Sequence, residues 1–103
     1  MDVIKLIKAQ QKIYELELDS NAKQLIMLLT VKAFQYGNGD DYFYLTDQRI
    51  NKMLGYGEKS KHKVINARNV LIENGMIEYE KGNNIKKTKT KYKVNWDNII
   101  NIK

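Results

Sequence analysis

The hydrophobic pattern of the chain changes its period at Gly75, and this change limits the possible folds more than any other feature of the sequence. Before Gly75, residues 60–74 carry apolar side chains at helical spacing, with Ser60 as the expected N-cap. After Gly75, the segment MIEYE alternates apolar and acidic side chains, and the segment IKKTKTKYKVNW again has a period of two. Such alternation is typical of strands. The sequence therefore predicts a helix that ends at a glycine in the left-handed C-cap position and leads into a two-stranded hairpin.

The turn of this hairpin is expected at Asn83 and Asn84, because asparagine tolerates tight-turn backbone conformations. With that register, the charge pairs across the strands are Glu80 with Lys87 and Glu78 with Lys89. The inward face is expected to carry Ile77, Tyr79, Thr88, Thr90, Tyr92 and Val94. In this register, no cross-strand glutamate fully offsets the charge of the four remaining lysines, Lys81, Lys86, Lys91 and Lys93.

Upstream of the hairpin region, the sequence predicts three more helices and a short strand. Residues 1–13 form an added N-terminal helix, and Ser20 is the expected N-cap of a core helix that ends in the loop of Gly37 and Gly39. Residues 42–46 form an aromatic strand, after which Thr46 or Asp47 caps a helix that is broken by residues 55–57. The apolar residues expected in these two helices are Leu25, Ile26, Leu28, Leu29, Val31, Phe34, Ile50, Met53 and Leu54.

Length and element order together predict one α+β domain that spans residues 1–103. Its charge is distributed unevenly. The net charge is +6, and residues 81–93 hold six lysines and no acid, so the rest of the chain is balanced with twelve basic and twelve acidic residues. Such a local positive potential favours a phosphate backbone as partner. The alternative is a solvated basic loop that serves solubility.

Other functional classes lack the residues that they need. The chain has no cysteine, which excludes disulfides, thiolate zinc sites and cysteine nucleophiles. His62 is the only histidine and has no acidic neighbours, while Asp40 and Asp41 are turn formers without a catalytic partner. We therefore expect no enzyme, no metal and no cofactor. No apolar run reaches the roughly 18 residues of a membrane span, so a cytoplasmic protein that does not contact membranes is expected.

The tyrosines allow two interpretations. Tyr42, Tyr44, Tyr79 and Tyr92 fall at strand spacing, which favours packing in the core or in a half-buried sheet. The alternative is that they stack on the bases of single-stranded nucleic acid.

The order of helix, strand, helix, glycine turn, helix and hairpin resembles the winged helix-turn-helix family over residues 20–95. The phrase ARNVLIENGMIEYE is similar to the end of that family's recognition helix. The resemblance implies a support helix at residues 47–54, a recognition helix at residues 60–74 and a wing of two or three antiparallel strands at residues 76–95. Residues 1–13 are then an arm helix and residues 96–103 a C-terminal extension. Arg68 departs from the family, which more often has an apolar residue there; either the helix is rotated or Arg68 extends to the surface.

In that family, the recognition helix enters the major groove of double-stranded DNA. If Val64 and Leu71 point inward, the outward positions are His62, Asn66, Asn69 and Glu73. For Asn69 and Glu73 an ordinary solvated helix face is the favoured interpretation. The expected contacts from this helix are Lys59, Lys61, His62, Lys63 and Asn66. The wing is expected to contribute more, through Lys81, Gly82, Asn83, Asn84, Lys86, Lys87, Lys89 and Lys91.

Size, composition and the N-terminal extension are similar to small proteins of mobile elements in low-GC Gram-positive bacteria, and in particular to origin-of-transfer binding proteins of clostridial conjugative plasmids. This resemblance implies a role in plasmid transfer and assembly with relaxosome or replication proteins. The expected binding is sequence-specific, at AT-rich sites that suit the small wing tip and at repeated sites that suit the small footprint of one domain. The alternatives are a transcriptional regulator, a replication accessory and a winged helix that binds protein.

Because a lone winged helix covers little DNA, a homodimer is expected. Its candidate contacts are Val3, Ile4, Ile7, Trp96, Ile99 and Ile100, unless these termini pack back onto their own domain.

Overall fold

A computed structural model describes residues 3–36, 42–57 and 61–102, except for the side chain of Lys61. Across these residues the fold is α+β, as predicted, with five helices and a three-stranded antiparallel sheet. The helices are α1 (Val3–Glu15), α2 (Ser20–Tyr36), α3 (Asp47–Leu54), α4 (Lys61–Glu73) and α5 (Trp96–Ile100). The strands are β1 (Phe43–Tyr44), β2 (Ile77–Glu80) and β3 (Lys91–Val94). None of the described helices is long and apolar enough to cross a membrane.

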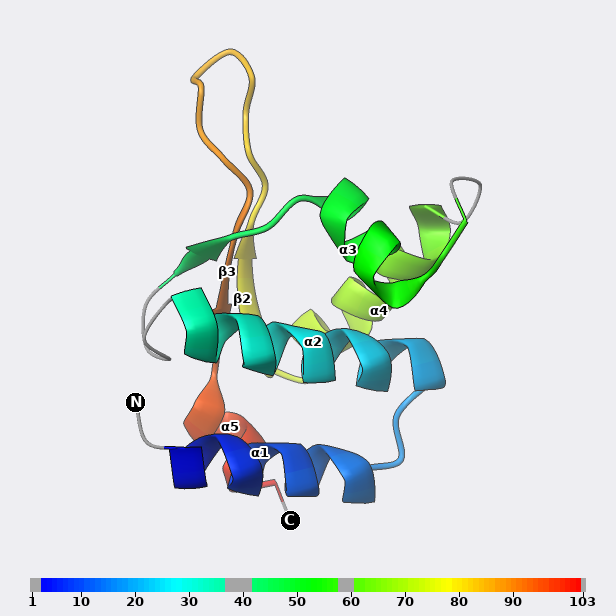
Figure 1. The fold of residues 1–103 in the computed structure, drawn as a ribbon, viewed down its shortest axis with the longest axis vertical. Coiled ribbons are helices and arrows are strands. Elements are labelled where there is room, and N and C mark those ends of the chain that lie inside the picture. Colours follow the sequence, from blue (N-terminus) through cyan, green and yellow to red (C-terminus); the bar gives the residue numbers. More distant parts are fainter. Residues whose placement is uncertain (1–2, 37–41, 58–60, 103) are drawn as a thin grey trace.

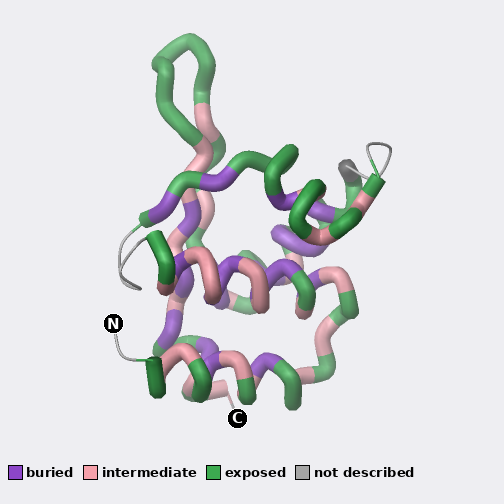
Figure 2. Tube along the Cα trace, viewed as in Figure 1, coloured by how far each residue is buried: buried purple, intermediate pink, exposed green. Residues whose placement is uncertain are grey.

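Helix α2 lies at the centre of the molecule. It runs between the layer of α1 and α5 on one side and the layer of α3, α4 and the sheet on the other (Figure 1). Leu25, Ile26 and Leu29 of α2 are fully buried, as expected, because apolar elements cover this helix on two sides. Leu28, Val31 and Phe34 are only half-buried. The buried positions form one continuous core that reaches every layer (Figure 2).

Helix boundaries follow local chemistry. The N-cap of α2 is Asp19 and not Ser20, because the carboxylate of Asp19 accepts hydrogen bonds from the backbone N–H groups of Asn21 (3.1 Å) and Ala22 (3.3 Å). Thr46 caps α3 as predicted, accepting from the N–H of Arg49 at 3.2 Å. The expected end of α2 at Gly37 and Gly39 and the expected cap at Ser60 lie outside the described residues.

Two glycines end helices with left-handed backbones. Gly55 stops α3 at φ +74°, and Gly75 stops α4 at φ +68°. Both conformations are strained for a residue with a side chain, which is why the sequence marks these helix ends clearly.

The sheet has the strand order β1, β3, β2, so that β3 is the central strand. The predicted register of the hairpin is wrong by four residues. Glu80 lies opposite Lys91 and Glu78 opposite Lys93, and the last cross-strand bridge joins Asn83 and Thr88. The predicted inward face is nevertheless correct for Ile77, Tyr92 and Val94, which are buried, because an even shift leaves every side chain on the same face.

The hairpin projects beyond the rest of the fold. It rises past β1 and α3 on the side of the molecule away from α1 and α5 (Figure 1). Residues 83–89 are all exposed, so no other part of the described chain covers them (Figure 2).

Candidate nucleic-acid interface

The end of the hairpin is a closed turn, which we call the hairpin tip (residues 82–89). Asn83 and Thr88 exchange backbone hydrogen bonds of 3.1 and 3.0 Å. The side-chain oxygen of Asn83 also accepts from the N–H groups of Ile85 (2.9 Å) and Lys86 (3.4 Å). The turn thus spans residues 84–87, and Lys87 adopts a left-handed φ of 55°. Local hydrogen bonds therefore hold the backbone of the tip without help from the core.

Gly82 allows the two strands to approach below the tip. A Cβ atom at this position would lie 2.6 Å from the backbone nitrogen of Thr90 and 2.8 Å from the carbonyl oxygen of Thr88. The N–H of Gly82 donates to the hydroxyl of Thr90 at 3.0 Å. Any residue other than glycine would therefore push the strands apart, and we assign Gly82 a role in shaping the hairpin.

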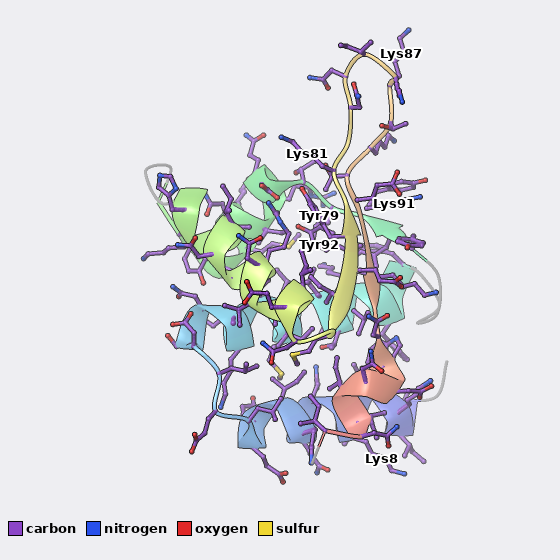
Figure 3. The ribbon with its side chains drawn as sticks, turned by 180° about the vertical axis from the view of Figure 1, so that it is seen from behind. Lys8, Tyr79, Lys81, Lys87, Lys91 and Tyr92 are labelled. Atoms are coloured by element: carbon purple, nitrogen blue, oxygen red, sulfur yellow. The ribbon has the colours of Figure 1, made fainter. Side chains whose placement is uncertain are left out.

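The lysines of the hairpin point in different directions. Lys81 extends toward the side of α3 and α4, Lys87 lies at the far end, and Lys91 extends to the opposite side (Figure 3). Lys81, Lys86, Lys87 and Lys89 are exposed. The positive charge is thus concentrated at and around the tip, where the described chain brings no acidic side chain into an ion pair with it.

Lys91 differs from the other predicted wing contacts. Its Nζ lies 3.3 Å from Oε2 of Glu80 and 4.6 Å from the ring centre of Tyr42. Lys93 lies over the same ring at 5.7 Å and faces Glu78 across the strands. These two lysines are therefore engaged within the outer face of the sheet, where glutamates offset their charge.

The tyrosines divide between the two faces of the sheet. Tyr92 is buried and Tyr79 half-buried, as predicted for core packing. Tyr42 and Tyr44 are exposed to 42% and 61%, contrary to that prediction, because the sheet places them on its outer face. There lysine ammonium groups stack on their rings, including Lys89 over Tyr44 at 5.7 Å.

The exposed face of α4 is the one that the sequence predicted. His62, Asn66, Asn69 and Glu73 are exposed, whereas Val64 and Leu71 are buried. Lys63 is exposed and lies over the ring of Tyr56 at 5.2 Å. Lys59 and the side chain of Lys61 lie outside the described residues.

Arg68 fills a position that neither sequence-based alternative anticipated. Only 7% of the residue is exposed. Its Nη1 donates to Oδ1 of Asp47 at 2.6 Å and to the hydroxyl of Tyr92 at 2.9 Å, and its guanidinium lies 4.2 Å from the ring centre of Tyr79. Helix α4 is therefore not rotated and Arg68 does not reach the surface. It joins α4 to the start of α3 and to both strands of the hairpin.

The electrostatics of this cluster follow from burial. Burial disfavours the charge of Arg68, but the hydrogen bonds to Asp47 and Tyr92 outweigh it, and the pKa of the guanidinium lies above its ordinary value. Burial also raises the pKa of Tyr92 to about 12, against the opposing effect of Arg68. At neutral pH the guanidinium of Arg68 is thus charged, and the hydroxyls of Tyr79 and Tyr92 are neutral.

The terminal helices pack on their own domain. Trp96 and Ile99 of α5 are 3% and 0% exposed and Ile100 is half-buried, because α5 lies against α1. Trp96 and Ile99 are therefore not available as dimer contacts. Val3, Ile4 and Ile7 remain 49% to 58% exposed on α1.

Two features of this region were not predicted from the sequence. One is the cluster of Arg68, Asp47, Tyr79 and Tyr92, whose members come from four separate elements. The other is Ile85, an isoleucine in the turn that is 94% exposed, and its signal was an apolar residue within a polar turn sequence. Among the described residues, no group of three or more His, Cys, Asp or Glu side chains is arranged to hold a metal ion. Comparisons with protein-family models, with curated proteins and with solved structures find no match.

Proposed function

We propose that this chain is a winged helix-turn-helix protein that binds double-stranded DNA. In this assignment α3 and α4 form the helix-turn-helix around the left-handed turn at Gly55, and β2 and β3 with their tip form the wing. The order of the elements supports it, as does their packing: α2 and α4 lie against the sheet, and α3 lies against α2 and α4.

The observation that carries the proposal is the hairpin tip. It projects from the fold, and its exposed charges are lysines without an acidic side chain in the segment 81–93 (Figure 1). Such a projecting cation cluster suits the high phosphate density that flanks a DNA groove. A loop that served only solubility would not need the internal hydrogen bonds that fix its shape.

Two surfaces share the recognition in this proposal. His62 and Asn66 of α4 face a major groove, where the amide of Asn66 suits the edge of adenine. The tip enters an adjacent minor groove in AT-rich sequence, which is narrow and strongly negative. Lys81, Lys86, Lys87 and Lys89 hold phosphates, whereas we assign Lys91 to the sheet.

The biological process rests on the sequence resemblance alone. We place the binding in plasmid transfer, with assembly of a relaxosome at an origin of transfer, and keep transcriptional or replication control as the alternative. A relaxase gene beside this one favours transfer, and a divergent promoter favours regulation. The second alternative is a winged helix that binds only protein, and such a protein is expected to show no affinity for DNA.

Fluorescence anisotropy with a library of short AT-rich duplexes, including sequence from upstream of the gene, tests the proposal. We expect a preferred duplex and an affinity that falls steeply with salt, because several lysines displace counterions. No binding at low salt would overturn the proposal and favour the protein-interaction module.

A further inference from the structure

An isoleucine, Ile85, lies in the turn that closes the hairpin. Ile85 is 94% exposed, more than any other large apolar residue of the described chain, of which Tyr14 follows at 72%. Single exposed apolar residues are common on protein surfaces, so exposure alone carries no function. What distinguishes Ile85 is where it lies and how the backbone holds it.

The turn presents Ile85 in a fixed direction. Its own N–H is bonded to the side-chain oxygen of Asn83 at 2.9 Å, and the bridge between Asn83 and Thr88 closes the turn directly below it. Further down, Gly82 and Thr90 hold the strands together through a hydrogen bond of 3.0 Å. An apolar side chain on a preorganised tip loses little further conformational freedom when it is buried in a partner.

The surroundings of Ile85 identify the chemistry of that partner. Lys86 and Lys87 follow it directly, and Lys81 and Lys89 are exposed lower on the hairpin. The nearest acid in the strands, Glu80, is paired with Lys91. An apolar point surrounded by cations suits a target that is apolar inside and anionic outside, which describes the stacked bases of a duplex between its phosphate backbones.

We propose that Ile85 is a wedge that inserts between adjacent base pairs from the minor groove and bends the duplex. The inference rests on the proposed function and adds to it an activity, the bending of DNA. Lysines of the tip hold the phosphates on either side of the opened step. Flexible pyrimidine–purine steps such as TA are the preferred point of insertion, because they unstack most easily.

The test is a duplex labelled at both ends with a fluorescence resonance energy transfer pair. Wild-type protein is expected to shorten the end-to-end distance on binding. Ile85→Ala is expected to bind about tenfold more weakly and to leave the duplex nearly straight, since the wedge is gone while the lysines remain. Ile72→Ala, the same change at an isoleucine of α4 that is 41% exposed, serves as the matched control and is expected to bend DNA as the wild type does.

A second duplex distinguishes the loss of wedge insertion in Ile85→Ala from a general loss of affinity for DNA. This duplex carries an unpaired base at the insertion step, which already loosens the base stack. Ile85→Ala is expected to bind it only about twofold more weakly than the wild type does. Binding of intact duplex by the wild type without any bend, or equal bending by Ile85→Ala, would overturn the wedge and leave the proposed function standing. Absence of any duplex binding would overturn both.

Discussion

Arg68 is the buried residue that connects α4 with α3 and with both strands of the hairpin. The residue is 7% exposed, whereas both alternatives drawn from the sequence pattern left it unburied. What the pattern cannot supply is its partners. Asp47 and Tyr92 lie 21 and 24 positions away in the chain, and no local periodicity connects residues at such separations. The sequence therefore predicted neither the burial of Arg68 nor the ion pair that makes this burial tolerable.

Replacing Arg68 with methionine is expected to lower the free energy of unfolding by about 2 to 4 kcal/mol, because the hydroxyl of Tyr92 and the carboxylate of Asp47 lose their donor. Urea denaturation measures the change. Arg49→Met removes the same charge from an exposed position of α3 and is expected to change stability by less than about 0.5 kcal/mol. Equal effects of the two substitutions would show that the buried arginine contributes no more to the free energy of unfolding than an exposed one does.

The raised pKa of Tyr92 predicts a loss of folding stability at alkaline pH. In the folded protein its pKa is raised to about 12, whereas in the unfolded chain it titrates near the ordinary value of about 10. The folded state therefore binds more protons between these values, so stability is at its full value below about pH 10 and falls as the pH rises toward about 12. Urea denaturation at about pH 9 and about pH 11 measures the loss.

Tyr92→Phe removes the titrating group and is expected to flatten this alkaline loss, although it lowers stability at neutral pH by removing a bond to Arg68. Tyr44→Phe, at a ring that is 61% exposed, is expected to leave the alkaline loss unchanged. The interpretation fails if both variants retain the wild-type dependence on pH.

For β2 and β3, the sequence predicted which residues face inward but not how the two strands align. A period of two distinguishes odd from even shifts, and the observed register differs from the predicted one by four, which the pattern cannot detect. The turn chemistry that fixes the register lies in Asn83, Gly82 and Thr90, through contacts that appear only in three dimensions. This shift assigns Lys91 and Lys93 to glutamate partners.

The two proposed DNA-binding elements can be ranked by mutation. Lys86→Ala with Lys87→Ala is expected to weaken duplex binding about thirtyfold, since two phosphate contacts are lost. His62→Ala with Asn66→Ala is expected to weaken it about fivefold and to reduce the preference among duplexes, since base contacts are lost. Gel-shift titrations compare the pairs. All four residues are exposed, so thermal unfolding is expected to stay the same, and a larger loss from the helix pair would reverse the ranking.

At the scale of the whole molecule, the termini complete the domain. The sequence predicted α1 but left the role of residues 96–103 open between a dimer contact and packing on the same chain. Burial of Trp96 and Ile99 against the core favours packing on the same chain. Amphipathic patterns reveal that an apolar face will be covered, and they do not reveal which copy of the chain covers it.

Among the predicted dimer contacts, Val3, Ile4 and Ile7 of α1 remain exposed, so we place the expected homodimer interface there. Light scattering is expected to give a mass of two chains of 12.1 kDa each, and Ile7→Glu is expected to give one. Met53→Glu places the same charge on an exposed apolar residue of α3 and is expected to leave the dimer intact. A wild-type mass of one chain would rule out this interface.

If lysines of the hairpin tip hold the phosphates of a duplex, their removal must reduce the salt dependence of binding. Anisotropy is measured with one preferred duplex from about 50 to about 300 mM salt. Lys86→Ala with Lys87→Ala is expected to reduce the slope of log affinity against log salt by about 1.8, since each lost phosphate contact contributes about 0.9. Lys91→Ala with Lys93→Ala removes the same charge from the outer face of the sheet and is expected to reduce the slope by less than about half of that. Equal reductions by the two pairs, or an unchanged slope for the tip pair, would show that the hairpin tip is not the main contact with the phosphates.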